Sequence, residues 1–504
     1  MKVSVAISLS RPAVQLGLLS LAIHLICNGQ YGFFRDELYF IVCGSRPDWG
    51  YVDQPPLVPL LAYGAHWLSG DWLLGFRLLP GLVMSAAVAL TAEFALLVGG
   101  GRFAQWLAGL CVLFSGVLLA HGLLFSTDMF QALTWLGCCW CLVKIAQTDN
   151  QKYWLSFGVI VGVSLLSKYL VVFYLAALAP GLLLTPLRRS LLRPQLWLGA
   201  GIALLMILPN LIWQQQHGWP FLELGSAGVH GKNLALSPLD FLLQQLLLIE
   251  PLAFPVWAIG LWASAVDRSY RMFPIAYVLL FAIFVMTHGK AYYLAPAYPA
   301  LLAFGAVTIE QWITSPRLRA AALALVVLSG AIAAPLAVPV LPPDTYIAYA
   351  SALGMSPSAM SAEHIKLNAL PQHFADMFGW PEMAASIAAA YHRLPPQEQA
   401  KAVFFGQNYG EAAAIDVFGA RLGLPPAISG HNQYWLWGPR GDGSVIIVIG
   451  GDLKKEQAQF DSVEEVGRTN APYAIPYETD KPIRVLRGLR MPMNKLWPEL
   501  KHYQ

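Results

Sequence analysis

Charged residues are scarce in this chain of 504 residues. They make up 12% of it, against an ordinary share of about 25%. Hydrophobic residues make up 57%, and the mean hydropathy is +0.53. The net charge of +3 is small and the basic residues are scattered through short loops, which excludes a nucleic-acid-binding surface. The composition predicts a polytopic membrane protein.

The chain also lacks cysteines in its last part and a phosphate-binding loop at its triple glycine. Cysteine does not occur after Cys141, so the last part of the chain contains no disulfide. Cys138 and Cys141 have C-x-x-C spacing, but they lie in an apolar run without a histidine partner and are interpreted as core residues. A triple glycine ends at Gly101 and is followed by Arg102 rather than by Gly-Lys-Ser/Thr, which excludes a phosphate loop there.

Long apolar runs are what the chain has in abundance. Their lengths predict roughly eleven transmembrane helices. The runs fall at residues 13–28, 72–98, 105–120, 129–146, 154–167, 169–184, 196–213, 241–264, 272–287, 294–314 and 320–340.

The basic residues between these runs predict the orientation. If the N-terminus is cytoplasmic, twelve lysines and arginines fall inside and five outside, which follows the positive-inside rule. The five outside are Arg35, Arg46, Lys168, Lys232 and Lys290. We therefore expect a multi-pass membrane protein with a cytoplasmic N-terminus and an extracytoplasmic C-terminal part.

The composition changes near residue 340. Residues 1–340 carry the predicted spans. They include an outer loop, residues 29–71, whose segment DQPPLVPLLAYGAHWL is short and contains three prolines. This segment predicts a helix on the membrane surface. Residues 341–504 have no long apolar run, and AVFF and SVIIVIG are typical of strands. They predict an extracytoplasmic soluble α/β domain.

Acidic residues occur at three outer positions. Asp36 and Glu37 lie in YGFFRDELYF, Asp53 in WGYVDQPP and Asp128 in LLFSTDMF. A carboxylate where an apolar wall meets water is a candidate general base, and Arg35 would keep it ionised. The alternative for Asp36 and Asp128 is capping of the following helix. Three such sites in a charge-poor chain favour convergence on one cavity.

Cations and tyrosines occur at the same depth. Arg77, Lys168 and Lys290 would suit the phosphate of an anionic lipid, although each could instead pair with an acid or extend to the interface. Tyr292 and Tyr293 predict either an interfacial aromatic belt or hydrogen bonds to sugar or phosphate. In the tail, GQNYGEAAAID predicts a strand-to-helix junction, where an α/β domain places a ligand or simply a turn.

Several motifs together resemble a known family. YGFFRDELYFIVCGSRPDWGYVDQPPLVPLLA, STDMF, LLSKYLVVFYL and GKAYYLAPAYPALLA occur in that order. They resemble the bacterial members of the dolichyl-phosphate-mannose protein mannosyltransferase-like family, the GT-C fold enzymes of glycosyltransferase family 39. The tail looks like the outer soluble domain of a bacterial subgroup.

The resemblance implies a function and a site. Such enzymes move a hexose or pentose from a polyprenyl-phosphate carrier to an envelope lipid, glycan or protein, with inversion and without a nucleotide sugar. The family's first-loop acid corresponds to Asp36, with Glu37 beside it, and its second acid to Asp128. Its phosphate-binding cations correspond to Lys168 and Lys290. Some relatives hold a divalent metal at the paired acids and others do not, so a metal at Asp36 and Glu37 stays open.

Two functions of other classes remain as alternatives. A transporter or flippase for an isoprenoid lipid would also need charges at membrane depth, but it usually places them near the midplane and has repeated halves. A non-catalytic subunit that binds a sugar-lipid would tolerate loss of the acidic pair. The clustering of charges at one face, without a visible repeat, favours the transferase.

Overall fold

The structure is a computed structural model that describes residues 9–228, 233–360, 363 and 366–503. Lys232, one of the five cations predicted outside, lies beyond these residues. The described chain forms two compact units. Unit 1 comprises the described residues of Met1–Gly29 together with Arg77–Ile212 and Leu234–Val340. Unit 2 comprises Gln30–Phe76 and the described residues of Trp213–Asn233 and Leu341–Gln504.

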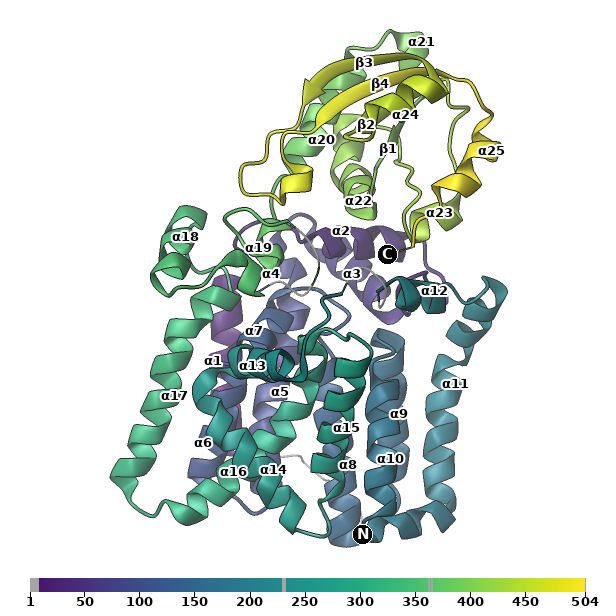
Figure 1. Cartoon of the computed structure of the whole chain (residues 1–504). Helices are drawn as coiled ribbons and strands as arrows, with labels where there is room; N and C mark the ends of the chain where they lie inside the picture. Colours follow the sequence, from purple (N-terminus) through teal and green to yellow (C-terminus); the bar gives the residue numbers. More distant parts are fainter. Residues whose placement is uncertain (1–8, 229–232, 361–362, 364–365, 504) are drawn as a thin grey trace. The chain divides into compact units, whose positions relative to one another are not determined.

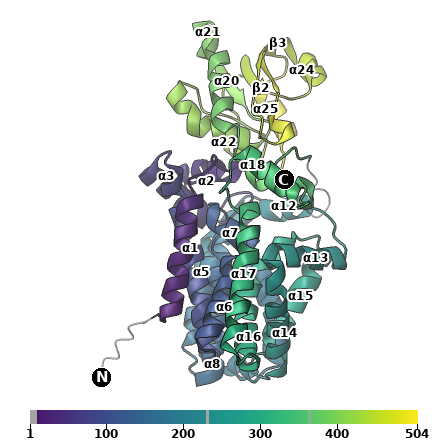
Figure 2. The ribbon, with the colours of Figure 1, turned by 90° about the vertical axis from the view of Figure 1, so that its left-hand side faces the viewer.

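Unit 1 is entirely helical in its described elements, and its long helices run side by side in Figures 1 and 2. Its helices are α1 (Arg11–Cys27), α5 (Leu78–Leu97), α6 (Arg102–Leu113), α7 (Gly116–Leu123), α8 (Gln131–Thr148), α9 (Tyr153–Ser167), α10 (Val171–Leu183), η1 (Pro186–Leu192), α11 (Pro194–Gln216), α13 (Pro238–Ile249), η3 (Pro251–Ala253), α14 (Phe254–Val266), α15 (Met272–Met286), η4 (Ala291–Ala297), α16 (Tyr298–Trp312) and α17 (Pro316–Ala337).

Several of these helices suit a membrane. Among the described residues, four helices are long and apolar enough to cross one, or up to seven spans if each bent helix pair counts as one. Three shorter apolar helices, α1, α9 and α15, come in addition. The mostly helical membrane fold is therefore confirmed, while the number of eleven spans stays a prediction.

Two runs predicted as single spans are broken. Residues 105–120 form parts of α6 and α7, which meet at 65°. Residues 241–264 form parts of α13 and α14, which meet at 105° around η3. The second break follows from Pro251, because a residue before proline is disfavoured in the helical conformation. Glu250 there has a φ of 96°.

Close backbone contact joins α14 to α16. A Cβ atom added to Gly260 would lie 1.9 Å from the carbonyl oxygen of Leu301, and one added to Gly305 would lie 1.8 Å from that of Val256. Only glycine permits helices to approach so closely, and small residues serve this purpose at helix interfaces within membranes. This pair of glycines fixes the separation of two central helices.

Unit 2 contains the small sheet and the first outer loop. The four strands are β1 (Ala402–Phe405), β2 (Val445–Ile449), β3 (Phe460–Arg468) and β4 (Pro482–Leu489). Their order is β1-β2-β4-β3, with β1 parallel to β2 and the other pairs antiparallel. The strands expected from AVFF and SVIIVIG are thus confirmed.

The other described elements of unit 2 are helices. They are α2 (Arg35–Ser45), α3 (Leu57–Ser69), α4 (Leu73–Phe76), α12 (Pro220–Ala227), α18 (Pro343–Ala352), η5 (Pro357–Met360), α19 (Gln372–Ala375), α20 (Trp380–His392), α21 (Pro396–Gln399), α22 (Tyr409–Phe418), η6 (Gly419–Leu422), α23 (Gln433–Trp437), α24 (Leu453–Gln459), η7 (Pro476–Glu478), α25 (Met493–Leu496) and η8 (Trp497–Leu500).

The first outer loop packs with the tail. Helix α2 lies against both α3 and α22, the helix that follows β1. Helix α3 corresponds to the expected surface helix and leaves Trp67 and Leu68 exposed at 74% and 79%. Its position at a membrane surface stays a prediction.

Replacing Gly305 by alanine tests the contact between α14 and α16. Because the new Cβ would overlap a backbone oxygen, we expect a destabilisation of about 1–3 kcal/mol. This corresponds to a fall of the apparent Tm in detergent by roughly 2 °C or more. Gly201→Ala is the control, since no heavy atom lies within 4 Å of its added Cβ. An equal apparent Tm for Gly305→Ala and Gly201→Ala would contradict the close contact between α14 and α16.

Candidate functional site

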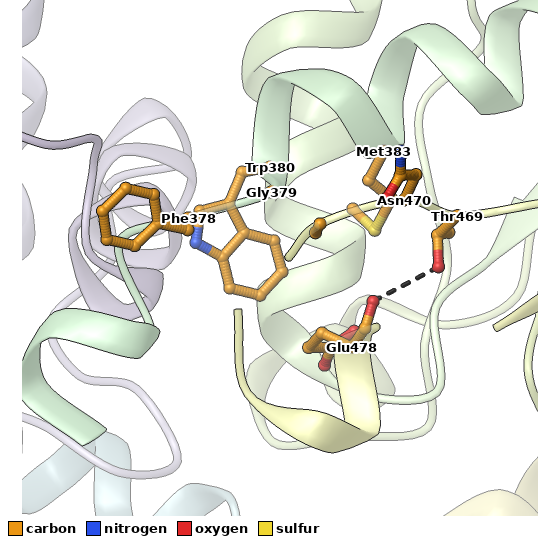
Figure 3. A pocket seen from close by; sticks show the side chains of 8 residues that line it. Phe378, Gly379, Trp380, Met383, Thr469, Asn470 and Glu478 are labelled. Carbon is orange, nitrogen blue, oxygen red and sulfur yellow. Dashed lines mark hydrogen bonds between the residues drawn. The ribbon is translucent and has the colours of Figure 1, made fainter. Parts of the chain in front are cut away.

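A small cavity in unit 2 is not the site (Figure 3). It is lined by Phe378, Trp380, Met383 and Glu478, among others, and its volume is about 10 Å³. Such a volume holds about one water molecule. Thr469 closes one side by donating a hydrogen bond from Oγ1 to the backbone oxygen of Glu478. A sugar or lipid does not fit there.

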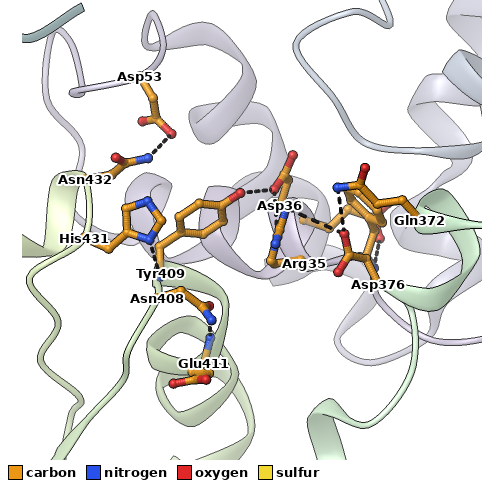
Figure 4. Close-up of polar contacts among 12 residues, drawn as sticks. Arg35, Asp36, Asp53, Gln372, Asp376, Asn408, Tyr409, Glu411, His431 and Asn432 are labelled. Carbon is orange, nitrogen blue, oxygen red and sulfur yellow. Dashed lines mark hydrogen bonds and ion pairs between the residues drawn. The ribbon is translucent and has the colours of Figure 1, made fainter. Parts of the chain in front are cut away.

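The two carboxylate oxygens of Asp36 differ in their contacts, since Oδ1 has polar partners and Oδ2 has none among the described side chains (Figure 4). It lies in the first turn of α2, and its side chain is 35% exposed. The hydroxyl of Tyr409 donates a hydrogen bond of 2.7 Å to Oδ1, and Nε of Arg35 lies 3.7 Å from the same oxygen. Within the described part of the chain, no side chain hydrogen-bonds Oδ2. One oxygen is therefore fixed and the other can accept a proton.

Arg35 is held by three partners. Its Nη1 donates to the hydroxyl of Tyr477 at 2.6 Å, and its Nη2 lies 3.6 Å from Oδ2 of Asp376. Its guanidinium also lies over the ring of Tyr409, 5.3 Å from the centroid. Burial has the largest single effect and disfavours the charged form, but Asp376 and the other surrounding groups together outweigh it and raise the pKa of Arg35. The arginine is thus a fixed positive charge beside Asp36.

Glu37 has a local structural role. It is fully buried, and its Oε2 accepts a 2.8 Å hydrogen bond from the backbone N–H of Phe34 at the start of α2. Capping of α2 therefore comes from Glu37, while the helix already begins at Arg35 and Asp36 is not its N-cap.

The paired acids do not fit a divalent cation. Successive helix residues point about 100° apart, and Glu37 is buried while Asp36 is part-exposed. No group of three or more His, Cys, Asp or Glu residues suited to a metal occurs within the part that the structure describes. We therefore assign no step to a metal at Asp36 and Glu37.

Asp53 is connected to Asp36 through two tyrosines. Tyr39 donates a 3.0 Å hydrogen bond to Oδ1 of Asp53, and Nδ2 of Asn432 donates one of 3.2 Å to Oδ2. The rings of Tyr39 and Tyr409 lie 4.6 Å apart. Burial raises the pKa of Asp53 to about 6. These contacts place two of the three predicted acidic sites in one polar cluster of unit 2.

The sequence did not reveal that Tyr409 contacts Asp36 or that Asp376 contacts Arg35. Tyr409 begins α22, directly after β1, within the segment GQNYGEAAAID. The strand-to-helix junction expected there is confirmed, but the contact of Tyr409 with Asp36 joins residues 373 positions apart. The predicted junction was the sequence signal that could have drawn attention to Tyr409.

Unit 1 brings the other acid and two lysines together. Nζ of Lys168 lies 2.8 Å and 2.7 Å from the two carboxylate oxygens of Asp128. It also lies 4.5 Å from the ring centroid of Tyr293, and Nζ of Lys290 lies 5.8 Å from that of Tyr292. Asp128 is 8% exposed. This group, the Asp128–Lys168 cluster, carries net positive charge beside two aromatic rings.

Arg77 is fully buried at the start of α5. Its Nη1 donates to the backbone oxygen of Asn28, and Nδ2 of Asn28 donates to the backbone oxygens of Arg77 and Gly122. These contacts tie α1, α5 and α7 together. The arginine thus has a clear structural role, and its binding of phosphate stays a prediction.

Comparison with known sequences yields relatives for part of the chain. Residues 53–213 match the family model described as dolichyl-phosphate-mannose-protein mannosyltransferase. The lipid A galacturonosyltransferase RgtD of Rhizobium johnstonii is 27% identical over 236 residues, which are 45% of this chain and 49% of the relative. A polyprenol-phosphate-mannose–protein mannosyltransferase of Corynebacterium glutamicum is 26% identical over 108 residues, 21% of each chain. The chain spans about half the length of the first relative and about a fifth of the second.

Solved structures match nearly the whole fold. ArnT from Cupriavidus metallidurans bound to undecaprenyl phosphate has a TM-score of 0.62 at 15% identity, covering 94% of this chain and 97% of ArnT. The arabinofuranosyltransferase AftD from Mycobacteria has a TM-score of 0.51 at 14% identity, covering 95% of this chain and 40% of AftD. These matches confirm the predicted GT-C fold.

The buried Asp376 predicts a pH dependence of stability. It is 1% exposed, and burial raises its pKa to about 6, because the opposing attraction of Arg35 is smaller. A carboxyl group with a raised pKa in the folded state stabilises the fold fully below its unfolded pKa, and this contribution is lost as the pH rises through about 6. We expect a loss of roughly 2–3 kcal/mol between pH 4 and pH 7.

Asp376→Asn is the test. The variant cannot release a proton, so its thermal stability should change less with pH than that of the wild type over this interval. Thermal unfolding in detergent at pH 4 to 7 measures the difference, with the exposed Asp461→Asn as control. The same pH profile for Asp376→Asn and the wild type would refute the assignment.

Proposed function

We propose that this chain, a GT-C protein of the glycosyltransferase-family-39-like group, transfers a sugar from a polyprenyl-phosphate donor to an envelope acceptor with inversion. The observation that carries the proposal is the carboxylate of Asp36, which has one oxygen fixed by Tyr409 and Arg35 and one oxygen open. The names of the relatives support it, since they are transferases and one acts on lipid A.

Asp36 acts as the general base. Its Oδ2 takes the proton of an acceptor hydroxyl while the hydroxyl oxygen forms a bond to the anomeric carbon. The bond between that carbon and the donor phosphate breaks, and the phosphate leaves with the electron pair. Tyr409 and Arg35 hold Oδ1 in place. Asp53 and Tyr39 support this arrangement through the ring of Tyr409.

The Asp128–Lys168 cluster binds the donor phosphate. Lys168 and Lys290 supply positive charge for the leaving group, which is most effective where water is excluded. Tyr292 and Tyr293 donate hydrogen bonds to phosphate or sugar. Asp128 keeps Lys168 in place through two short contacts.

The setting is the bacterial cytoplasmic membrane, with a cytoplasmic N-terminus and an extracytoplasmic tail. The distribution of lysines and arginines supports this orientation. The acceptor is an envelope lipid, glycan or protein. A flippase and a non-catalytic binding subunit are less well supported, because both curated relatives carry the names of transferases.

Asp36→Asn tests the general base. Loss of a general base typically slows a reaction about 100- to 10,000-fold, so we expect a fall of this size in kcat. Transfer is measured with total envelope lipid extract as the source of donor and acceptor, followed by mass spectrometry of the products. Asp48→Asn is the matched control, because Asp48 is an exposed carboxylate of the same outer loop. Near-normal turnover of Asp36→Asn with an intact melting curve would rule out the role.

The lysines are tested through donor affinity. Lys290→Gln should raise KM for the donor about tenfold while leaving thermal stability unchanged, because it removes charge from the phosphate site. Lys168→Gln alone would leave Asp128 buried beside a neutral partner. The double variant Asp128→Asn/Lys168→Gln therefore separates loss of phosphate binding from loss of stability. An unchanged donor KM in both Lys290→Gln and the double variant would contradict the assignment.

A further inference from the structure

Unit 1 contains an apolar groove that is lined mainly by residues of α8, α9, α10 and α11. Its volume is about 380 Å³, within the range of roughly 300–1,000 Å³ that is usual for ligand sites. Val161, Leu178 and Ala203 are among the side chains of its wall. Leu204 also lines it and is 56% exposed, so the groove opens to the surface of unit 1. Such a wall suits hydrocarbon chains.

One polar atom in the wall has no partner. Trp154 lines the groove at the start of α9 and is 5% exposed. Its Nε1 makes no hydrogen bond within the described part of the chain. Oε1 of Gln195, which precedes the lining residue Leu196, is likewise buried without a partner among the described residues. A buried donor costs free energy unless an acceptor reaches it, so a ligand with polar oxygens fits this end of the groove.

The same end carries positive charge. Helix η1 and the residue after it hold three exposed arginines, Arg188, Arg189 and Arg193. Leu191, between them, lines the groove. None of the three forms an ion pair with any residue that the structure describes. Basic residues beside a cleft between membrane helices attract anionic head groups.

This end is separate from the proposed phosphate site. Trp154 lies in the first turn of α9, and Lys168 follows the last residue of the helix. Fifteen helical residues span about 22 Å at about 1.5 Å per residue. The groove therefore begins at the opposite end of α9 from the Asp128–Lys168 cluster, and the proposed function does not use it.

We propose that the groove binds one anionic glycerophospholipid of the membrane. Its acyl chains lie along the apolar wall, and its phosphate lies among Arg188, Arg189 and Arg193. A phosphate or ester oxygen accepts the hydrogen bond of Trp154. The charge selects an anionic lipid over a zwitterionic one, because none of the three arginines forms an ion pair with a described residue.

The test uses the full chain, purified in detergent and stripped of lipid. Phosphatidylglycerol and phosphatidylcholine with the same acyl chains are titrated separately, and bound lipid is counted by native mass spectrometry. We expect one phosphatidylglycerol to bind at least about tenfold more tightly than phosphatidylcholine, since each basic residue contributes roughly fivefold. Replacing the three arginines by glutamine should remove this preference. Trp154→Phe should lower the affinity for phosphatidylglycerol about fivefold.

A matched pair of alanines tests the groove itself. Ala179 and Ala176 are both exposed on α10, but only Ala179 lines the groove. Ala179→Phe should fill the groove and lower the affinity for phosphatidylglycerol at least about tenfold. Ala176→Phe should bind phosphatidylglycerol as the wild type does. Equal binding by the two variants, or equal affinity of the wild type for both lipids, would overturn the proposal. So would Ala179→Phe losing undecaprenyl phosphate but keeping phosphatidylglycerol, which would assign the groove to an isoprenoid tail.

Discussion

Unit 2 depends on the contacts that one largely buried arginine, Arg35, makes with the tail. Arg35 is charged and largely withdrawn from water, and a buried charge is tolerated only with partners that replace its hydration. Asp376 and Tyr477, both from the tail, supply these partners, and the backbone N–H of Arg35 also donates to the backbone oxygen of Asp376. The first outer loop and the tail therefore form one unit, and the position of Asp36 depends on a domain hundreds of residues away.

The spans were easier to predict from the sequence than their breaks. Hydropathy located the helices of unit 1, because each must satisfy its backbone internally and present apolar side chains around its surface. It joined α13 to α14, since a window average does not register a single proline that turns the chain by 105°. The tight contact of Gly260 and Gly305 was also invisible, because glycine spacing alone does not identify the partner helix.

The candidate site was likewise only partly predictable from the sequence. Asp36, Asp53, Asp128 and Lys168 stood out because charges are rare near apolar runs, and the structure gives each of them defined polar partners. Their partners in the tail could not be predicted, because Tyr409 and Asn432 are joined to the loop only by folding. Glu37 was grouped with Asp36 by adjacency, whereas helix geometry turns neighbouring side chains apart and left Glu37 to cap the helix.

The two ends of unit 1 treat positive charge differently, and this difference has a physical reason. Lys168 is neutralised by Asp128, while the arginines of η1 have no acidic partner among the described residues. The phosphate site that we propose at Lys168 must release its product after each turnover, and it gains nothing from holding substrate and product equally tightly. An acid beside the lysine weakens the attraction for a bound dianion while fixing the ammonium group in place. The proposed site for a resident lipid has no such requirement, so cations without an acidic ion-pair partner suit it.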